Sequence, residues 1–206
     1  MEVPRHTGFP VAFLGARVLA SYDNAPSRVR NAERSRVTAG RRREGLRQNV
    51  VMTRSIATNT DVDLAGLLEF VRPRHHMIVI ARRRDGSPQA SPVTGGVDHQ
   101  GRIVISTYPD RAKSNNLRRD PQCSVLVLSD DVGDAWVQVD GSAEVIDAPD
   151  SVEPLVEYFR SISGEHPDWQ EYREAMIAQG KSLIRLTPLR WGPIATGGFP
   201  ARLADG

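Results

Sequence analysis

The sequence contains a single cysteine, Cys123, among its 206 residues. An intrachain disulfide is therefore excluded, and a reducing compartment such as the cytoplasm is the expected location. No apolar run approaches the about 18 residues that a membrane helix needs, so we expect no membrane association. Cys123 lies in an apolar run with no histidine near it in the sequence, and we expect a buried strand residue rather than a nucleophile.

Lysine is almost as scarce, since only Lys113 and Lys181 occur against 25 arginines. Either these two lysines have a function, or an arginine-rich coding bias left them by chance. The positive charge is also uneven, because residues 1–54 carry a net charge of +7 and the remainder carries −5. A basic tail on an acidic body does not indicate a nucleic-acid-binding domain, so no nucleic-acid partner is expected.

Residues 1–54 show no sustained hydrophobic period and are rich in arginine, which predicts a disordered extension. An organelle transit peptide has a similar composition, but we favour an extension without a fold and a translation start near Met52. The folded domain is expected over residues 55–192. The glycines and prolines that follow predict an irregular tail over residues 193–206.

Short apolar segments separated by turn signals dominate the predicted domain. We expect strands at residues 77–81, 89–97, 102–107, 123–128, 136–146 and 182–186. We expect helices at residues 64–71 and 110–117, and two further helices that begin at residues 150 and 168. Pro92 predicts an edge or a bulge, and Gly141 predicts a bulge. The run 123–128 is continuously apolar, so we expect it to be buried on both faces. The fold class is therefore mostly β with peripheral helices, as a closed or nearly closed six-stranded antiparallel barrel.

The segment between residues 106 and 121 contains the most informative charges. The strand that ends in Ser106 and Thr107 is followed by a helix, capped by Asp110, whose first turn carries Arg111 and Lys113. Cations there oppose the helix dipole, so the pattern becomes favourable only when an anion binds. Lys113 and Asn116 share one helix face and could grip a phosphate and a neighbouring polar group. A solvated basic helix is the alternative interpretation.

The string Arg-Ala-Lys-x-x-Asn-Leu-Arg-Arg-Asp-Pro at residues 111–121 resembles the pyridoxamine 5′-phosphate oxidase-like split β-barrel superfamily. Together with the run at residues 164–176, it is most similar to the actinobacterial branch that uses the deazaflavin coenzyme F-420. The resemblance implies a homodimer with the cofactor at the subunit interface. It implies that Arg111, Lys113 and Asn116 hold the phosphate and tail of the cofactor, with Ser106 and Thr107 beside them.

The same resemblance places the cofactor ring against the second strand near residues 91–94, which includes Val93. Trp136 either approaches the ring or is a plain core or interface residue. Arg118 and Arg119 could meet the acidic tail of the deazaflavin cofactor, or could be solvated. The implied activity is hydride transfer from reduced coenzyme F-420 to a small electron-poor substrate, with FMN as the alternative cofactor.

Two other functions stay open at this point. One is an FMN-dependent oxidase of pyridoxamine phosphate, which would need further basic residues such as Arg190 for the substrate phosphate. The other is a flavin- or deazaflavin-binding or storage protein without turnover. Since the cofactor carries the hydride chemistry, no catalytic side chain is required. The histidines lack metal-ligand spacing with cysteine or carboxylates, so no metal site is expected.

Overall fold

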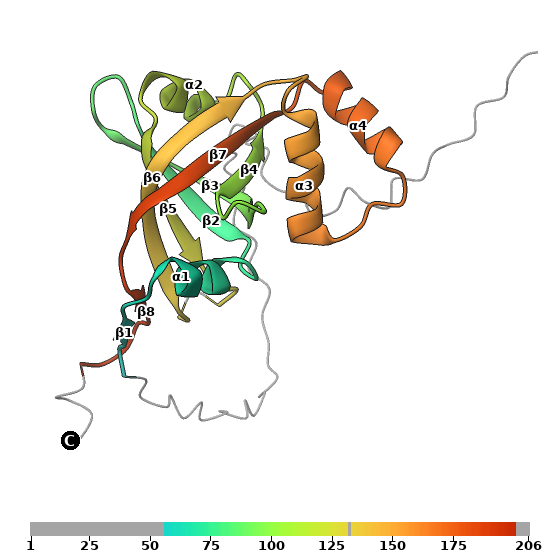
Figure 1. The fold of residues 1–206 in the computed structure, drawn as a ribbon. Coiled ribbons are helices and arrows are strands. Elements are labelled where there is room, and N and C mark those ends of the chain that lie inside the picture. Colours follow the sequence, from blue (N-terminus) through green and yellow to red (C-terminus); the bar gives the residue numbers. More distant parts are fainter. Residues whose placement is uncertain (1–55, 132, 201–206) are drawn as a thin grey trace, which may run out of the picture. The chain divides into compact units, whose positions relative to one another are not determined.

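The computed structural model describes residues 56–131 and 133–200, so the predicted extension over residues 1–54 lies outside the described residues. The described strands are β1 (Asn59–Thr60), β2 (His76–Arg82), β3 (Pro88–Val97), β4 (Ile103–Thr107), β5 (Gln122–Leu128), β6 (Trp136–Ile146), β7 (Ser182–Trp191) and β8 (Ile194–Ala195). The described helices are α1 (Leu64–Val71), α2 (Ala112–Arg119), α3 (Val152–Ser163) and α4 (Trp169–Ala178) (Figure 1).

Six antiparallel strands close into a barrel in the order β5–β2–β3–β4–β7–β6, with β6 also paired to β5. The predicted six-stranded antiparallel barrel is therefore confirmed. The predicted bulge at Gly141 is also present, because the register of β6 against β7 shifts between Asp140 and Gly141. A side chain at Gly141 would place its Cβ 2.3 Å from the carbonyl oxygen of Thr187, so only glycine fits this crossing.

Inward-facing residues of all six strands form the main core, and helices close the two ends of the barrel. Leu67 and Val71 of α1 enter this core at one end, and Leu117 of α2 enters it at the other (Figure 1). A second cluster lies outside the barrel, where α3 and α4 cover β4 and β7. Its buried members are Val104, Leu155, Tyr158 and Leu183.

Burial on both faces was predicted for the strand at residues 123–128, and this prediction is wrong within the described chain. In β5, Cys123, Val125 and Val127 are buried, whereas Leu126 and Leu128 are only half-buried. The strand whose two faces are covered is β4, because α3 packs against its outer face. The outer face of β2, β5 and β6 therefore keeps an apolar surface that no described element covers completely.

The C-terminal segment contains more structure than the sequence indicates. The last predicted strand ends at residue 186, but β7 continues to Trp191 and β8 follows it. The two-residue strand β8 pairs with β1, and the indole nitrogen of Trp191 donates to the carbonyl oxygen of Val62 at 2.9 Å. Residues 194–195 are thus a strand within the predicted irregular tail, and residues 201–206 lie outside the described part of the chain.

Candidate cofactor site

The barrel is split where β3 and β4 separate. Their ladder covers only Gly95–Val97 against Ile103–Ile105. The rest of β3 pairs with β2 alone among the described strands. Pro92 lies in this part of β3, as the edge prediction required, because proline cannot donate to a second neighbour.

A tyrosine of α3 occupies the point of separation. The N–H of Gly95 bonds to His75 on the side of β2, so the carbonyl of the preceding Thr94 points toward β4. The hydroxyl of Tyr158 donates to that carbonyl oxygen at 3.1 Å, and the N–H of Ser106 also interacts with the phenol oxygen. Tyr158 is only 2% exposed, and burial raises its pKa. Its hydroxyl thus stands where the next hydrogen bond between β3 and β4 would form.

The helix α2 starts directly beyond this split and has no side-chain cap. Its N-cap residue is Arg111, whose side chain makes no capping hydrogen bond, and its first turn contains no acidic residue. The predicted cap, Asp110, lies one residue too early and is exposed. The first backbone N–H groups of α2 therefore lack the side-chain acceptor that usually satisfies such groups.

Three cationic side chains gather at this helix start. The β4–β7 ladder ends with Thr107 opposite Ser182, so the flanking residues Tyr108 and Lys181 are neighbours. The ammonium of Lys181 lies 3.8 Å from the centre of the Tyr108 ring, and the guanidinium carbon of Arg111 lies 5.8 Å from it.

The third cation, Lys113, is half-buried. Burial lowers the pKa of Lys113, and the positive charges of Arg111 and Lys181 lower it further. None of the ion pairs within residues 56–131 and 133–200 involves any of these three cations. The arrangement is electrostatically unfavourable alone and suits an anionic ligand.

The polar residues predicted at the site differ in how available they are. Ser106 is half-buried at the split, whereas Thr107 is 3% exposed and faces the hydroxyl of Ser114 at 3.5 Å. Thr107 therefore supports the start of α2 from inside. Asn116 is buried, and its side-chain oxygen accepts a hydrogen bond from Arg119 at 3.1 Å. Its amide nitrogen bonds to no other described residue and stays available as a donor.

The two arginines that could have met an acidic cofactor tail have other partners. One guanidinium nitrogen of Arg118 donates to both carboxylate oxygens of Asp147, at 2.7 and 2.8 Å. Arg119 bonds to the carbonyl oxygen of Arg82 as well as to Asn116. From the sequence, Lys181 was notable only as one of two lysines. In the structure it joins Arg111 and Lys113 as a cation at the site that has no ion pair among the described residues.

Val93 and Trp136 lie on different strands of the sheet. Val93 is half-buried in the part of β3 that lacks a β4 partner, next to the split. Trp136 begins β6 and is level with Thr94, because the ladders of β3 with β2, β2 with β5 and β5 with β6 connect these two residues. Three spacings of about 4.8 Å between neighbouring strands put their backbones roughly 14 Å apart along the sheet. The contact between Trp136 and the cofactor ring stays a prediction.

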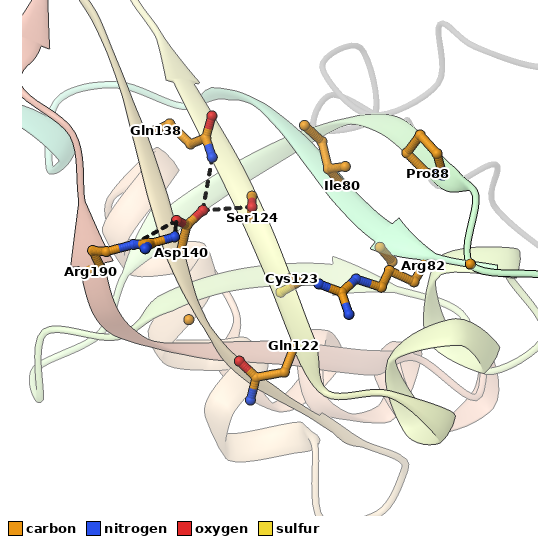
Figure 2. Close-up of a pocket in the computed structure, with 12 residues that line it drawn as sticks. Ile80, Arg82, Pro88, Gln122, Cys123, Ser124, Gln138, Asp140 and Arg190 are labelled. Carbon is orange, nitrogen blue, oxygen red and sulfur yellow. Dashed lines mark hydrogen bonds and ion pairs between the residues drawn. The ribbon is translucent and has the colours of Figure 1, made fainter. Parts of the chain in front are cut away.

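Trp136 lies on the open outer face, where it is 38% exposed. Two pockets of about 370 Å³ each lie on this face, one around Trp136 and one around Asp140. Figure 2 shows the second, in which Asp140 accepts hydrogen bonds from Ser124, Gln138 and Arg190. These bonds, that from Ser124 foremost, lower the pKa of Asp140. Neither pocket is lined by the cations at the start of α2.

Cys123 also lines the pocket around Asp140 but is not activated there. Burial raises the pKa of its thiol to about 12, with smaller contributions from Asp120 and Asp140. The expectation of a buried strand residue is confirmed. In the described part of the chain, no group of three or more histidine, cysteine or acidic residues is arranged to hold a metal ion. No described helix is long and apolar enough to cross a membrane.

The chain matches the pyridoxamine 5′-phosphate oxidase family over residues 66–195, and it belongs to that family. A conserved hypothetical protein from Mycobacterium tuberculosis has the same fold, with a TM-score of 0.57 and 22% identity over 68% of this chain and 89% of that one.

Two further solved structures are more distant. An F-420 reductase has a TM-score of 0.46 and 17% identity over 60% of this chain and 94% of that one. A heme-binding protein from Mycobacterium smegmatis has a TM-score of 0.49 and 19% identity over 68% of this chain and 56% of that one. These two likenesses are too weak to assign a ligand to this chain.

Two residues of the site were missed by reasoning from the sequence. Lys181 precedes the last long strand, and only the register of β7 against β4 brings it to Tyr108. The scarcity of lysine was the one signal that could have singled it out. Tyr158 looked like any other residue of a helix, and no local signal indicated that its hydroxyl enters the split.

Proposed function

We propose that this protein is an oxidoreductase that binds a flavin-type cofactor and uses reduced coenzyme F-420 to transfer a hydride to a small electron-poor substrate. Membership of the pyridoxamine 5′-phosphate oxidase family supports a cofactor of the FMN or F-420 type. The observation that carries the proposal is the group of cations at the uncapped start of α2 that have no ion pair among the described residues.

The described residues fit the anionic end of such a cofactor. Arg111 and Lys113 would bind its phosphate together with the first N–H groups of α2, because charge-assisted hydrogen bonds are the strong ones. The amide nitrogen of Asn116 would add a donor one helical turn further on. Ser106 would supply a hydroxyl at the edge of the split.

The ring of the cofactor would lie along the unpaired part of β3, near Val93 and Thr94. When bound, the cofactor supplies the hydride chemistry, so the protein needs only to position it and to exclude water. Tyr158 keeps this part of β3 separate from β4 and so preserves the backbone surface for the ring. No described side chain is required as nucleophile or general base.

A homodimer would complete the site. The outer face of β2, β5 and β6 presents half-buried Ile78 and Leu126 and the exposed Trp136, and contiguous apolar surface of this kind is typical of an interface. A second copy placed there would bury the open face of β5. It would also bury Trp136, whose contact with the cofactor ring stays a prediction.

The pyridoxamine phosphate oxidase alternative is less well supported. That reaction needs a second basic site for the substrate phosphate, and Arg190 was its candidate. Arg190 is instead engaged by Asp140 through hydrogen bonds at 2.8 and 3.2 Å. A carrier without turnover would bind the cofactor through the same residues. Only a measurement of activity distinguishes such a carrier from an enzyme.

The test begins with fluorescence titration of the purified protein with FMN and with coenzyme F-420. We expect tighter binding of coenzyme F-420, and tighter binding of FMN would contradict the cofactor assignment. The reduced cofactor is then mixed with the protein and a panel of enones and quinones. Oxidation that depends on both protein and substrate supports an enzyme, whereas tight binding without any oxidation supports a carrier.

A further inference from the structure

Lys181 is held in place by two helices that pack outside the barrel. Its backbone N–H donates to the carbonyl oxygen of Met176 at 3.1 Å, at the end of α4. Its carbonyl oxygen accepts a hydrogen bond at 2.6 Å from Ser151, a fully buried residue at the start of α3. Because both bonds use the backbone, the side chain is free to serve another purpose over the Tyr108 ring.

The number of charges at the site exceeds what one phosphate can neutralise. A phosphate monoester carries about −1.5 to −2 at pH 7. Arg111, Lys113 and Lys181 supply three positive charges, and the start of α2 adds about half a charge. A mononucleotide flavin would therefore leave about one to two positive charges without a counter-charge. A cofactor that carries carboxylates beyond its phosphate would neutralise them.

Resting on the proposed function, we propose that Lys181 determines cofactor specificity by binding a second anionic group, a carboxylate of the cofactor tail. Lys113 and Arg111 hold the phosphate on the first turn of α2, whereas Lys181 approaches from the start of β7, a different element. The ring of Tyr108 contacts both Arg111 and Lys181, and so connects the proposed phosphate position with the proposed carboxylate position. The site therefore favours a polyanionic cofactor over a monophosphate.

The experiment compares the affinities of wild type and Lys181→Ala for two probes, FMN and coenzyme F-420 with its glutamate tail. We expect Lys181→Ala to weaken binding of coenzyme F-420 by about tenfold or more, since it removes a hydrogen bond between charged groups. Binding of FMN should change by less than about twofold. Lys181→Arg should keep most of the affinity for coenzyme F-420, because it retains the charge.

A matched control is Arg72→Ala, which removes an exposed cation at the end of α1, at the opposite end of the barrel (Figure 1). This variant should leave both affinities unchanged. Thermal unfolding without cofactor should be similar for all variants, because the backbone bonds of Lys181 are retained.

Four outcomes would overturn the inference. Equal weakening of both probes in Lys181→Ala would mean that Lys181 shares the phosphate. Unchanged affinity for coenzyme F-420 would mean that it binds nothing. A wild-type protein that binds FMN alone would refute the preference for a polyanion and leave flavin binding intact, whereas one that binds neither probe would overturn the proposed function together with this inference.

Discussion

Replacement of Tyr158 by phenylalanine tests the origin of the split between β3 and β4. The substitution removes one hydroxyl from a side chain that is 2% exposed and leaves the carbonyl of Thr94 without its 3.1 Å donor. A buried acceptor left unsatisfied costs about 1–3 kcal/mol. For a domain of this size, about 2–4 °C of Tm corresponds to each kcal/mol, so we expect Tm to fall by roughly 5 °C.

Tyr172→Phe provides the matched control, because the Tyr172 hydroxyl donates to a backbone carbonyl at 3.2 Å but the residue is only half-buried. Water can replace that hydroxyl, so a smaller loss of about 0.5–1.5 kcal/mol is expected. Differential scanning calorimetry and urea unfolding measure both variants. If Tyr158→Phe were as stable as wild type, or less destabilised than Tyr172→Phe, Tyr158 would not maintain the split.

Three further predictions concern charge, reactivity and assembly. The pKa of Lys113 is lowered, and an anionic ligand favours the protonated form of this lysine. Affinity for the cofactor, measured by titrations over a series of pH values, should therefore fall as pH rises through that pKa. Lys113→Arg should abolish this fall, because arginine stays charged. The thiol of Cys123, with a pKa of about 12, should resist iodoacetamide at pH 8 in the native protein and should react after unfolding in urea. Mass spectrometry measures the modification in both states. Equal rates of modification in the native and unfolded protein would be inconsistent with burial of the thiol. Leu126→Glu places a charge on the open face of β5, where the proposed homodimer would form, so light scattering should show that the variant is monomeric at concentrations at which wild type is dimeric. A variant that dimerises as tightly as wild type would mean that the interface does not include this face.

The sequence was sufficient for features that depend on local patterning. Alternation and turn residues placed the barrel strands, and Gly141 marked a bulge that the structure contains. The cations at the start of α2 were also visible, because a helix dipole and its first turn are local properties. The cap of that helix was misplaced by one residue, since Asp110 and Arg111 differ only in where the backbone becomes helical.

Features that depend on distant pairing could not be read from the sequence. An apolar run such as that of β5 does not reveal whether a helix covers its second face, and in this chain α3 covers β4 instead. Lys181 reaches Tyr108 only through strand register. Tyr158 reaches Thr94 only because α3 packs over the split.

The central claim is that the cations at the start of α2 bind the negatively charged end of a cofactor. Its most direct test is the affinity of Lys113→Ala for coenzyme F-420, measured by fluorescence titration beside wild type and Arg72→Ala. The loss of a hydrogen bond between charged groups, worth about 1.5–3 kcal/mol, predicts about 10- to 150-fold weaker binding for Lys113→Ala. Arg72→Ala should bind with the affinity of wild type. Equal affinity in all three proteins would contradict the claim.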